Sequence, residues 1–165
     1  MKIEIFEVQN DEKEVLKQLL ELYQYDFSIF NDADVDDIGL YSYKHLDSYF
    51  DDPKRKAFFI KYNNKYCGFV MINDYLRVLK NEGSKAVAEF FVLKKYRRLG
   101  IGKYVSEKMF GMFPGKWEIF QQKNNEGAVD FWQNVIKEYT KNNYEIKDVI
   151  DNGVDGQVFI FNNSK

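Results

Sequence analysis

The sequence predicts an α/β or α+β fold in which helices flank a mixed, largely antiparallel sheet. Seven short runs of alternating or clustered apolar residues are typical of strands, and three longer segments carry apolar residues at helical spacing. These segments follow one another in the order βα(α)βββαβαββ, without strict alternation. The chain has 165 residues, of which 45% are hydrophobic and 18% aromatic, so we expect one ordinary domain over residues 1–165.

The chain begins with a strand and a helix. Residues 2–8 alternate charged and apolar side chains, which is typical of a strand. Residues 11–25 place Val15, Leu19 and other apolar side chains at helical spacing, and either Asn10 or Asp11 is suited to cap that helix.

An acidic segment and three apolar runs come next. Residues 26–52 have no long periodic pattern, so we expect an irregular segment with one short helix over residues 43–50. Asn63-Asn64 separates the first two apolar runs and predicts a hairpin between them. The runs that predict strands are residues 57–60, 67–72 and 87–93.

The C-terminal half contains two helices and three further strands. Residues 100–113 carry a helical apolar stripe, which Pro114-Gly115 ends. A second helix begins at Asn124 or Asn125, after which apolar residues recur on one helical face. Asn152-Gly153 predicts a turn between the last two strands. The strands expected here are residues 117–121, 144–150 and 158–161.

The most informative segment is FFVLKKYRRLGIGKY, residues 90–104, in which an apolar strand passes through a basic turn into a helix. The first turn of a helix has unpaired backbone N–H groups and carries about half a positive charge from the helix dipole. Gly100 and Gly102 let an anion approach that backbone without a Cβ in the way. The basic side chains nearby are Lys94, Lys95, Arg97, Arg98 and Lys103. The segment therefore predicts a diphosphate site.

Two common diphosphate motifs do not fit this loop. A dinucleotide fingerprint has a third glycine or an alanine where Val105 stands. A Walker A loop has glycine at the position of Arg97, and serine or threonine at that of Tyr104. The pattern present is R-x-x-G-x-G, from Arg97 to Gly102. It resembles the signature Q/R-x-x-G-x-G/A of the GNAT superfamily of N-acetyltransferases, in which this loop binds the pyrophosphate of coenzyme A.

A second motif strengthens the resemblance. The segment NEGAVDFW, which starts at Asn125, is similar to N-x-x-A-x-x-F-Y on the GNAT helix that borders the coenzyme, with Trp132 in place of the tyrosine. The resemblance implies a GNAT-like fold, acetyl-CoA as acyl-donor substrate, no metal, and a bond from Asn125 to the pantetheine arm; asparagine is equally a good helix cap. The coenzyme contacts it implies are Phe91, Val92, Leu93, Arg97, Arg98, Leu99, Gly100, Ile101, Gly102, Lys103, Asn125, Ala128 and Phe131.

The resemblance implies acetyl transfer to a primary amine. Glu89 is the candidate catalytic base, because it interrupts an apolar strand and several GNAT enzymes have a catalytic glutamate on this strand. An outward-facing or ion-paired glutamate is the alternative. By resemblance, a backbone N–H near Phe91 or Val92 would hold the oxyanion. Trp132 is expected in the core, which leaves the general acid unassigned, and Tyr139 lies two helical turns on, about 10 Å away.

The acidic segment suggests the kind of acceptor. Residues 26–52 contain eight aspartates and one basic side chain, Lys44, and such a field attracts cations. A polyamine, an aminoglycoside-like amine or a protein lysine would suit it, and a solvated acidic loop is the simpler interpretation. Asp32-x-Asp34-x-Asp36 lacks the glycine and the closing glutamate of a calcium loop.

Composition narrows the remaining classes. A net charge of −2 lacks the basic excess of nucleic-acid binders, and the chain has no run of 18 apolar residues to span a membrane. Cys67, the single cysteine, fits a reduced cytoplasmic setting, and His45, the single histidine, argues against histidine metal sites. We expect a small-molecule or protein amine as partner and leave a homodimer open. Two alternatives to the enzyme are a non-catalytic acyl-CoA-binding or sensory domain and a module for another diphosphate.

Overall fold

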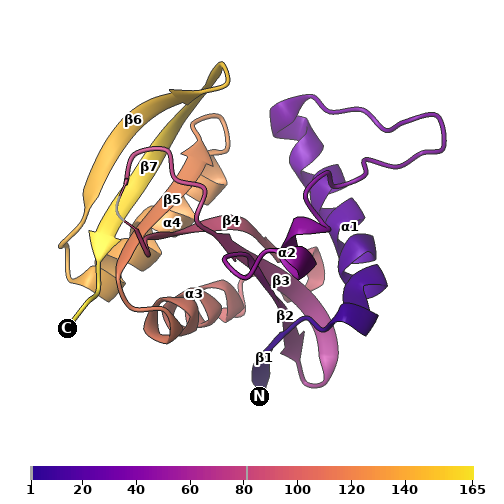
Figure 1. Cartoon of the computed structure of the whole chain (residues 1–165), viewed down its shortest axis with the longest axis horizontal. Helices are drawn as coiled ribbons and strands as arrows, with labels where there is room; N and C mark the ends of the chain where they lie inside the picture. Colours follow the sequence, from indigo (N-terminus) through magenta and orange to yellow (C-terminus); the bar gives the residue numbers. More distant parts are fainter. Residues whose placement is uncertain (1, 81) are drawn as a thin grey trace. The chain divides into compact units, whose positions relative to one another are not determined.

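The computed structural model of the chain describes residues 2–80 and 82–165. The strands form a seven-stranded sheet in the order β1-β2-β3-β4-β5-β7-β6 (Figure 1). They are β1 (Ile3–Glu7), β2 (Lys56–Tyr62), β3 (Lys65–Asn73), β4 (Lys85–Val92), β5 (Lys116–Gln122), β6 (Glu145–Asp151) and β7 (Val154–Asn162). The α-helices are α1 (Lys13–Asn31), α2 (Ser48–Asp51), α3 (Ile101–Met112) and α4 (Glu126–Thr140). The predicted order of elements is confirmed.

The sheet is mixed and mostly antiparallel, as the sequence predicts. β1 pairs antiparallel with β2, and β7 pairs antiparallel with both β5 and β6. β4 pairs in parallel with β5, where Lys85 lies opposite Trp117. Both predicted asparagine turns have left-handed backbone, at Asn63-Asn64 and at Asn152-Gly153.

The chain divides into two compact units. The first comprises residues up to Met71 together with Glu89–Lys95, and the second comprises Ile72–Ala88 and Tyr96–Lys165. β4 contributes to both units, so the expectation of a single domain stays a prediction. Within the described residues, no helix combines the length and the apolar character needed to cross a bilayer.

In the first unit, α1 packs its apolar face on the sheet. Leu16 and Leu20 are fully buried, and the Tyr23 ring meets the Phe69 ring of β3 edge-on at 5.7 Å. The helix reaches Asn31 rather than residue 25, because its aromatic face continues through Phe27, whose ring stacks on Tyr23 at 5.8 Å.

The start of α1 also differs from the prediction. Neither Asn10 nor Asp11 caps it. A short 3-10 turn, Asn10–Glu12, precedes the helix, and the Glu12 carboxylate accepts the Gln9 backbone N–H at 3.0 Å. The cap is therefore the Glu12 carboxylate, which reaches back to Gln9, the residue before the turn. The prediction missed it because asparagine and aspartate, at 10 and 11, are the more common capping residues.

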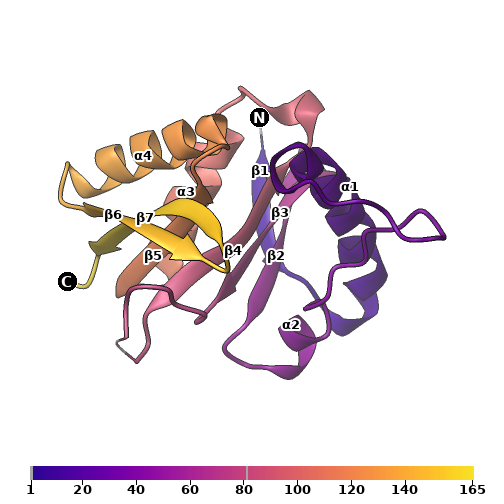
Figure 2. The ribbon, with the colours of Figure 1, turned by 90° about the horizontal axis from the view of Figure 1, so that it is seen from above.

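The second unit has its own aromatic core. The Phe110 ring of α3 lies 5.2 Å from Trp117 on β5 and 4.8 Å from Phe161 on β7. Figure 2 shows α4 running beside β5 and β7, with which it is in contact. Trp132 of α4 is only 3% exposed, which confirms its predicted place in the core.

Candidate active site

The carboxylate of Glu89 is held by two phenols in the first unit. Glu89 lies half-buried on β4. The Tyr43 hydroxyl donates to its Oε1 at 3.1 Å, and the Tyr23 hydroxyl donates to its Oε2 through a short hydrogen bond. Tyr23 belongs to α1, and Tyr43 to the segment that joins α1 to α2. One donor on each oxygen gives the carboxylate a defined orientation.

Both phenols remain hydrogen-bond donors throughout the neutral range. Burial, followed by the charge of Glu89, raises the pKa of Tyr23 and that of Tyr43 well above the ordinary value for tyrosine. Asp26 adds to the effect on Tyr23, and Tyr49 adds to the effect on Tyr43. A raised phenol pKa means that the neutral O–H persists to higher pH, so neither tyrosine loses its proton under assay conditions near neutrality.

The backbones of β3 and β4 approach closely next to Glu89. A Cβ on Gly68 would lie 2.0 Å from the Phe91 carbonyl oxygen, so only glycine fits there. One residue away, the Leu93 N–H donates to the Cys67 carbonyl at 2.8 Å. These contacts fix the backbone of Phe91, Val92 and Leu93, the strand residues predicted to contact the coenzyme. Their contact with the coenzyme stays a prediction.

The glycine loop forms an open helix N-terminus in the second unit. Arg98 and Gly100 have left-handed backbone, with φ of 68° and 78°, and Gly100 caps α3. Residues 97–100 are exposed, whereas Ile101 is 1% exposed and anchors the helix. A Cβ on Gly100 would meet no atom within 4 Å. The predicted role of this loop as an anion site stays a prediction.

Two of the basic side chains predicted near the loop have acidic partners. Lys103 forms an ion pair with Glu138 on α4, and the hydrogen bond to that carboxylate raises the pKa of Lys103. Lys94 pairs with Asp26 at 3.3 Å in the first unit. The sequence did not reveal these partners, because both are remote along the chain. Arg98 is exposed to solvent, and its guanidinium is suited to bind a phosphate.

The second motif starts α4. Asn125 caps the helix through its side-chain oxygen, which accepts the Ala128 N–H at 3.2 Å. Its predicted capping role is confirmed, and its bond to the pantetheine arm stays a prediction. Phe131 packs edge-on against Trp132 at 5.0 Å. The Tyr139 hydroxyl accepts an N–H of the Asn163 side chain at 3.1 Å, which gives that tyrosine a structural role within the unit.

The acidic segment is less negative than its sequence suggests. Basic residues outside it pair with three of its aspartates: Lys94 with Asp26, Lys13 with Asp47, and Arg55 with Asp52. The expected ratio of eight carboxylates to one lysine is therefore too high. Folding brings Lys13 and Lys94 to the segment, and Arg55 lies just beyond its end. Asp32, Asp34 and Asp37 remain exposed.

The sequence did not connect either tyrosine with Glu89. The separations along the chain are 66 residues for Tyr23 and 46 for Tyr43. Tyr23 and Tyr43 lie in a part of the sequence that is rich in aromatic residues, and such residues suit a core as well as a site. Glu89 itself was detectable, because a charge within an apolar strand is a local signal.

Comparisons with known proteins agree with this architecture. The model of the Acetyltransferase (GNAT) family matches residues 16–135, which is more than half of the chain. A search of curated proteins gave no match.

Solved structures share the fold at low sequence identity. An acetyltransferase from Thermus thermophilus has a TM-score of 0.69 at 14% identity, covering 98% of this chain and 97% of that one. A GNAT acetyltransferase from Staphylococcus aureus has a TM-score of 0.65 at 18% identity, covering 98% of this chain and 99% of that one. One from Elizabethkingia anophelis, with acetyl-CoA bound, has a TM-score of 0.58 at 17% identity, covering 97% of each chain. These structures share the fold of the chain, and the family match shows that the chain belongs to the GNAT family of acetyltransferases.

Proposed function

We propose that this chain transfers the acetyl group of acetyl-CoA to a primary amine, with Glu89 as the general base. The observation that carries the proposal is the half-buried Glu89 carboxylate, held on one oxygen by Tyr23 and on the other by Tyr43. A primary amine is an ammonium ion near neutral pH and cannot attack until it loses a proton. A carboxylate with a fixed orientation is suited to accept that proton.

The reaction then proceeds by direct attack. Glu89 takes a proton from the ammonium group, and the nitrogen lone pair forms a bond to the thioester carbonyl carbon. The carbonyl oxygen becomes an oxyanion, for which the backbone N–H of Phe91 or Val92 is the proposed donor. The C–S bond breaks as the carbonyl re-forms. The thiolate of coenzyme A leaves and takes up a proton, either from solvent or from the amine.

The donor site is proposed to be the loop that opens α3. The N-terminal N–H groups of α3, the open space at Gly100 and the exposed Arg98 offer positive potential and backbone donors for a pyrophosphate. Acetyl-CoA is the ligand of the Elizabethkingia anophelis relative, which supports the same donor here.

The acceptor is proposed to be cationic. Asp32, Asp34 and Asp37 are exposed on the segment that also supplies Tyr43 to Glu89. These carboxylates attract cations, and they belong to the segment whose Tyr43 holds the proposed base. They would therefore raise the local concentration of a polyamine, an aminoglycoside or a lysine side chain.

Release of coenzyme A tests this function. Acetyl-CoA is incubated with spermidine, an aminoglycoside and a lysine-containing peptide, and the free thiol is followed. We expect turnover with at least one amine, and Glu89→Gln should lower kcat on the order of 100-fold or more, because the amide cannot accept the proton. Acetyl-CoA affinity should not change. Glu14→Gln is the matched control, since Glu14 is exposed on the first turn of α1. Full activity of Glu89→Gln at every pH would refute the role of Glu89 as base.

A non-catalytic acyl-CoA-binding or sensory domain is the second candidate. It is favoured by Trp132, which is buried where the family motif has a tyrosine. Tight binding of acetyl-CoA without thiol release for any amine tested would support this second candidate over the enzyme.

A further inference from the structure

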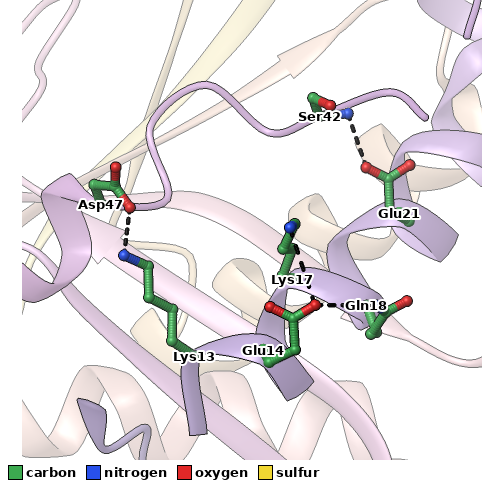
Figure 3. Close-up of polar contacts among 7 residues, drawn as sticks. All are labelled: Lys13, Glu14, Lys17, Gln18, Glu21, Ser42 and Asp47. Atoms are coloured by element: carbon green, nitrogen blue, oxygen red, sulfur yellow. Dashed lines mark hydrogen bonds and ion pairs between the residues drawn. The ribbon is translucent and has the colours of Figure 1, made fainter. Parts of the chain in front are cut away.

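The segment between α1 and α2 folds back along α1 and is fastened to it at two points (Figure 3). The Glu21 carboxylate accepts the backbone N–H groups of both Tyr41 and Ser42, each at 2.8 Å. Eight residues earlier along the same helix, Lys13 forms an ion pair with Asp47. Tyr43 lies between these points, and its hydroxyl reaches Glu89.

The backbone of Ser42 makes the Glu21 attachment necessary. Ser42 has a φ of 58°, in the left-handed region that residues other than glycine rarely adopt. Such a conformation persists only where the surrounding structure holds it. Glu21 provides that hold, because an ionised carboxylate forms strong, short hydrogen bonds to backbone N–H groups. Without it, Ser42 would relax toward an ordinary φ and carry the adjacent Tyr43 side chain away from Glu89.

We infer that Glu21 is a positioning residue for the Glu89 carboxylate, acting through Tyr43. Glu21 fixes the backbone of Tyr41 and Ser42, and this places the Tyr43 hydroxyl on Glu89. The consequence of this link for catalysis rests on the proposed role of Glu89 as base, whereas the link itself is measurable without any acceptor.

The groups that surround Glu89 determine what a titration will report. Tyr23 reaches it from α1 and Tyr43 from the joining segment. Asp26 of α1 acts on Tyr23, and Tyr49 of α2 acts on Tyr43. Lys94, just after β4, pairs with Asp26 at 3.3 Å. The two phenols that bind Glu89 keep their protons well beyond neutral pH, since their pKa values are raised.

The titration of Glu89 provides the test. The side-chain carboxyl ¹³C signal of Glu89 is followed with pH in the full-length protein and assigned by its loss in Glu89→Gln. Tyr43→Phe removes one hydrogen-bond donor from the carboxylate, which should raise the titration midpoint by about one pH unit. Glu21→Gln removes a charge and one of two acceptors and should raise the midpoint in the same direction. In the double variant the midpoint should match that of Tyr43→Phe alone.

The direction of the shift separates this link from simple electrostatics. Loss of the Glu21 charge, acting through space, would lower the midpoint of Glu89, because a nearby like charge disfavours ionisation. A lower or unchanged midpoint in Glu21→Gln, or additive shifts in the double variant, would overturn the inference. Glu14→Gln is the matched control. Glu14 is a carboxylate on the same helix that accepts a hydrogen bond from the Gln18 side chain, so its loss should leave the midpoint of Glu89 unchanged.

Turnover then distinguishes this inference from the proposed function. If both hold, Glu21→Gln and Tyr43→Phe lower kcat and move the acid limb of its pH profile upward, with little change in the KM for acetyl-CoA. If the midpoints shift as expected but Glu89→Gln remains fully active, Glu21 positions Glu89 through Tyr43, but Glu89 is not the general base. If Glu89→Gln is inactive but the midpoint of Glu89 does not respond to Glu21→Gln as expected, Glu89 remains the proposed base and the inference about Glu21 fails.

Discussion

Gly68 shows how one missing side chain shapes the strand that carries Glu89. The space for its Cβ is filled by the Phe91 carbonyl oxygen, at 2.0 Å, and this oxygen belongs to backbone that cannot swing aside. A substitution here must move β3 away from β4. The residue therefore links packing of the sheet to the position of the strand that carries Glu89.

We expect Gly68→Ala to destabilise the protein by about 1–3 kcal/mol, the usual cost of overpacking a well-packed interior. Urea unfolding measures this loss. Gly111→Ala is the control with the opposite expected sign: Gly111 is exposed within α3, its Cβ would meet no atom within 4 Å, and alanine is the better helix former. Equal stability of Gly68→Ala and the native protein would mean that the two strands separate at no cost.

At the scale of the element, α3 and its preceding loop form the proposed pyrophosphate site. Gly102 lies in the first turn of α3 and is half-buried. An aspartate there would set a carboxylate against a diphosphate, yet it would suit the positive end of the helix dipole, so the helix itself should persist.

We therefore expect Gly102→Asp to weaken acetyl-CoA binding about 100-fold or more. The new carboxylate and the pyrophosphate are both negative, and two like charges in contact cost several kcal/mol at an interface. Isothermal titration calorimetry gives the affinity, and circular dichroism checks the fold. Gly111→Asp places the same carboxylate at the other end of the same helix and should bind acetyl-CoA normally. Retained affinity in Gly102→Asp would move the coenzyme site away from this loop.

Elements differed in how far the sequence predicted them. α3 and α4 carried clear apolar stripes and glycine, proline or asparagine boundaries, and the structure places them within a residue or so of prediction. The C-terminal end of α1 was missed, because Asp32 ends it with a left-handed φ of 55° and gives none of the usual glycine signal. The tyrosine contacts of Glu89 were missed for a different reason: they exist only after distant segments have packed together.

At the scale of the whole molecule, binding should appear as added stability. A ligand present at 100 times its dissociation constant stabilises the folded state by about 2.7 kcal/mol. For a chain of this length we expect acetyl-CoA and coenzyme A to raise the melting temperature by about 5–10 °C. NAD and ATP serve as parallel controls and should have no effect. A rise in melting temperature with NAD or ATP instead would mean that the loop binds a ligand other than coenzyme A.

Family membership was predictable at this scale, because two spaced motifs and the order of elements carried it. The charge around the acceptor segment was not. Its aspartates are local in sequence. Of the three cations that pair with them, Arg55 lies only three residues beyond Asp52, but Lys13 and Lys94 reach the segment only through the fold.

Cys67 has a consequence for how such a protein can be studied. It is the single cysteine of the chain, is 0% exposed on β3, and burial raises the pKa of its thiol to about 11. The native protein should therefore be silent toward Ellman's reagent, which reacts with thiolates. In an assay of the folded protein, each equivalent of reagent consumed would therefore correspond to one released coenzyme A. Reaction of Cys67 itself would require unfolding, so its rate without substrate would report the unfolding rate.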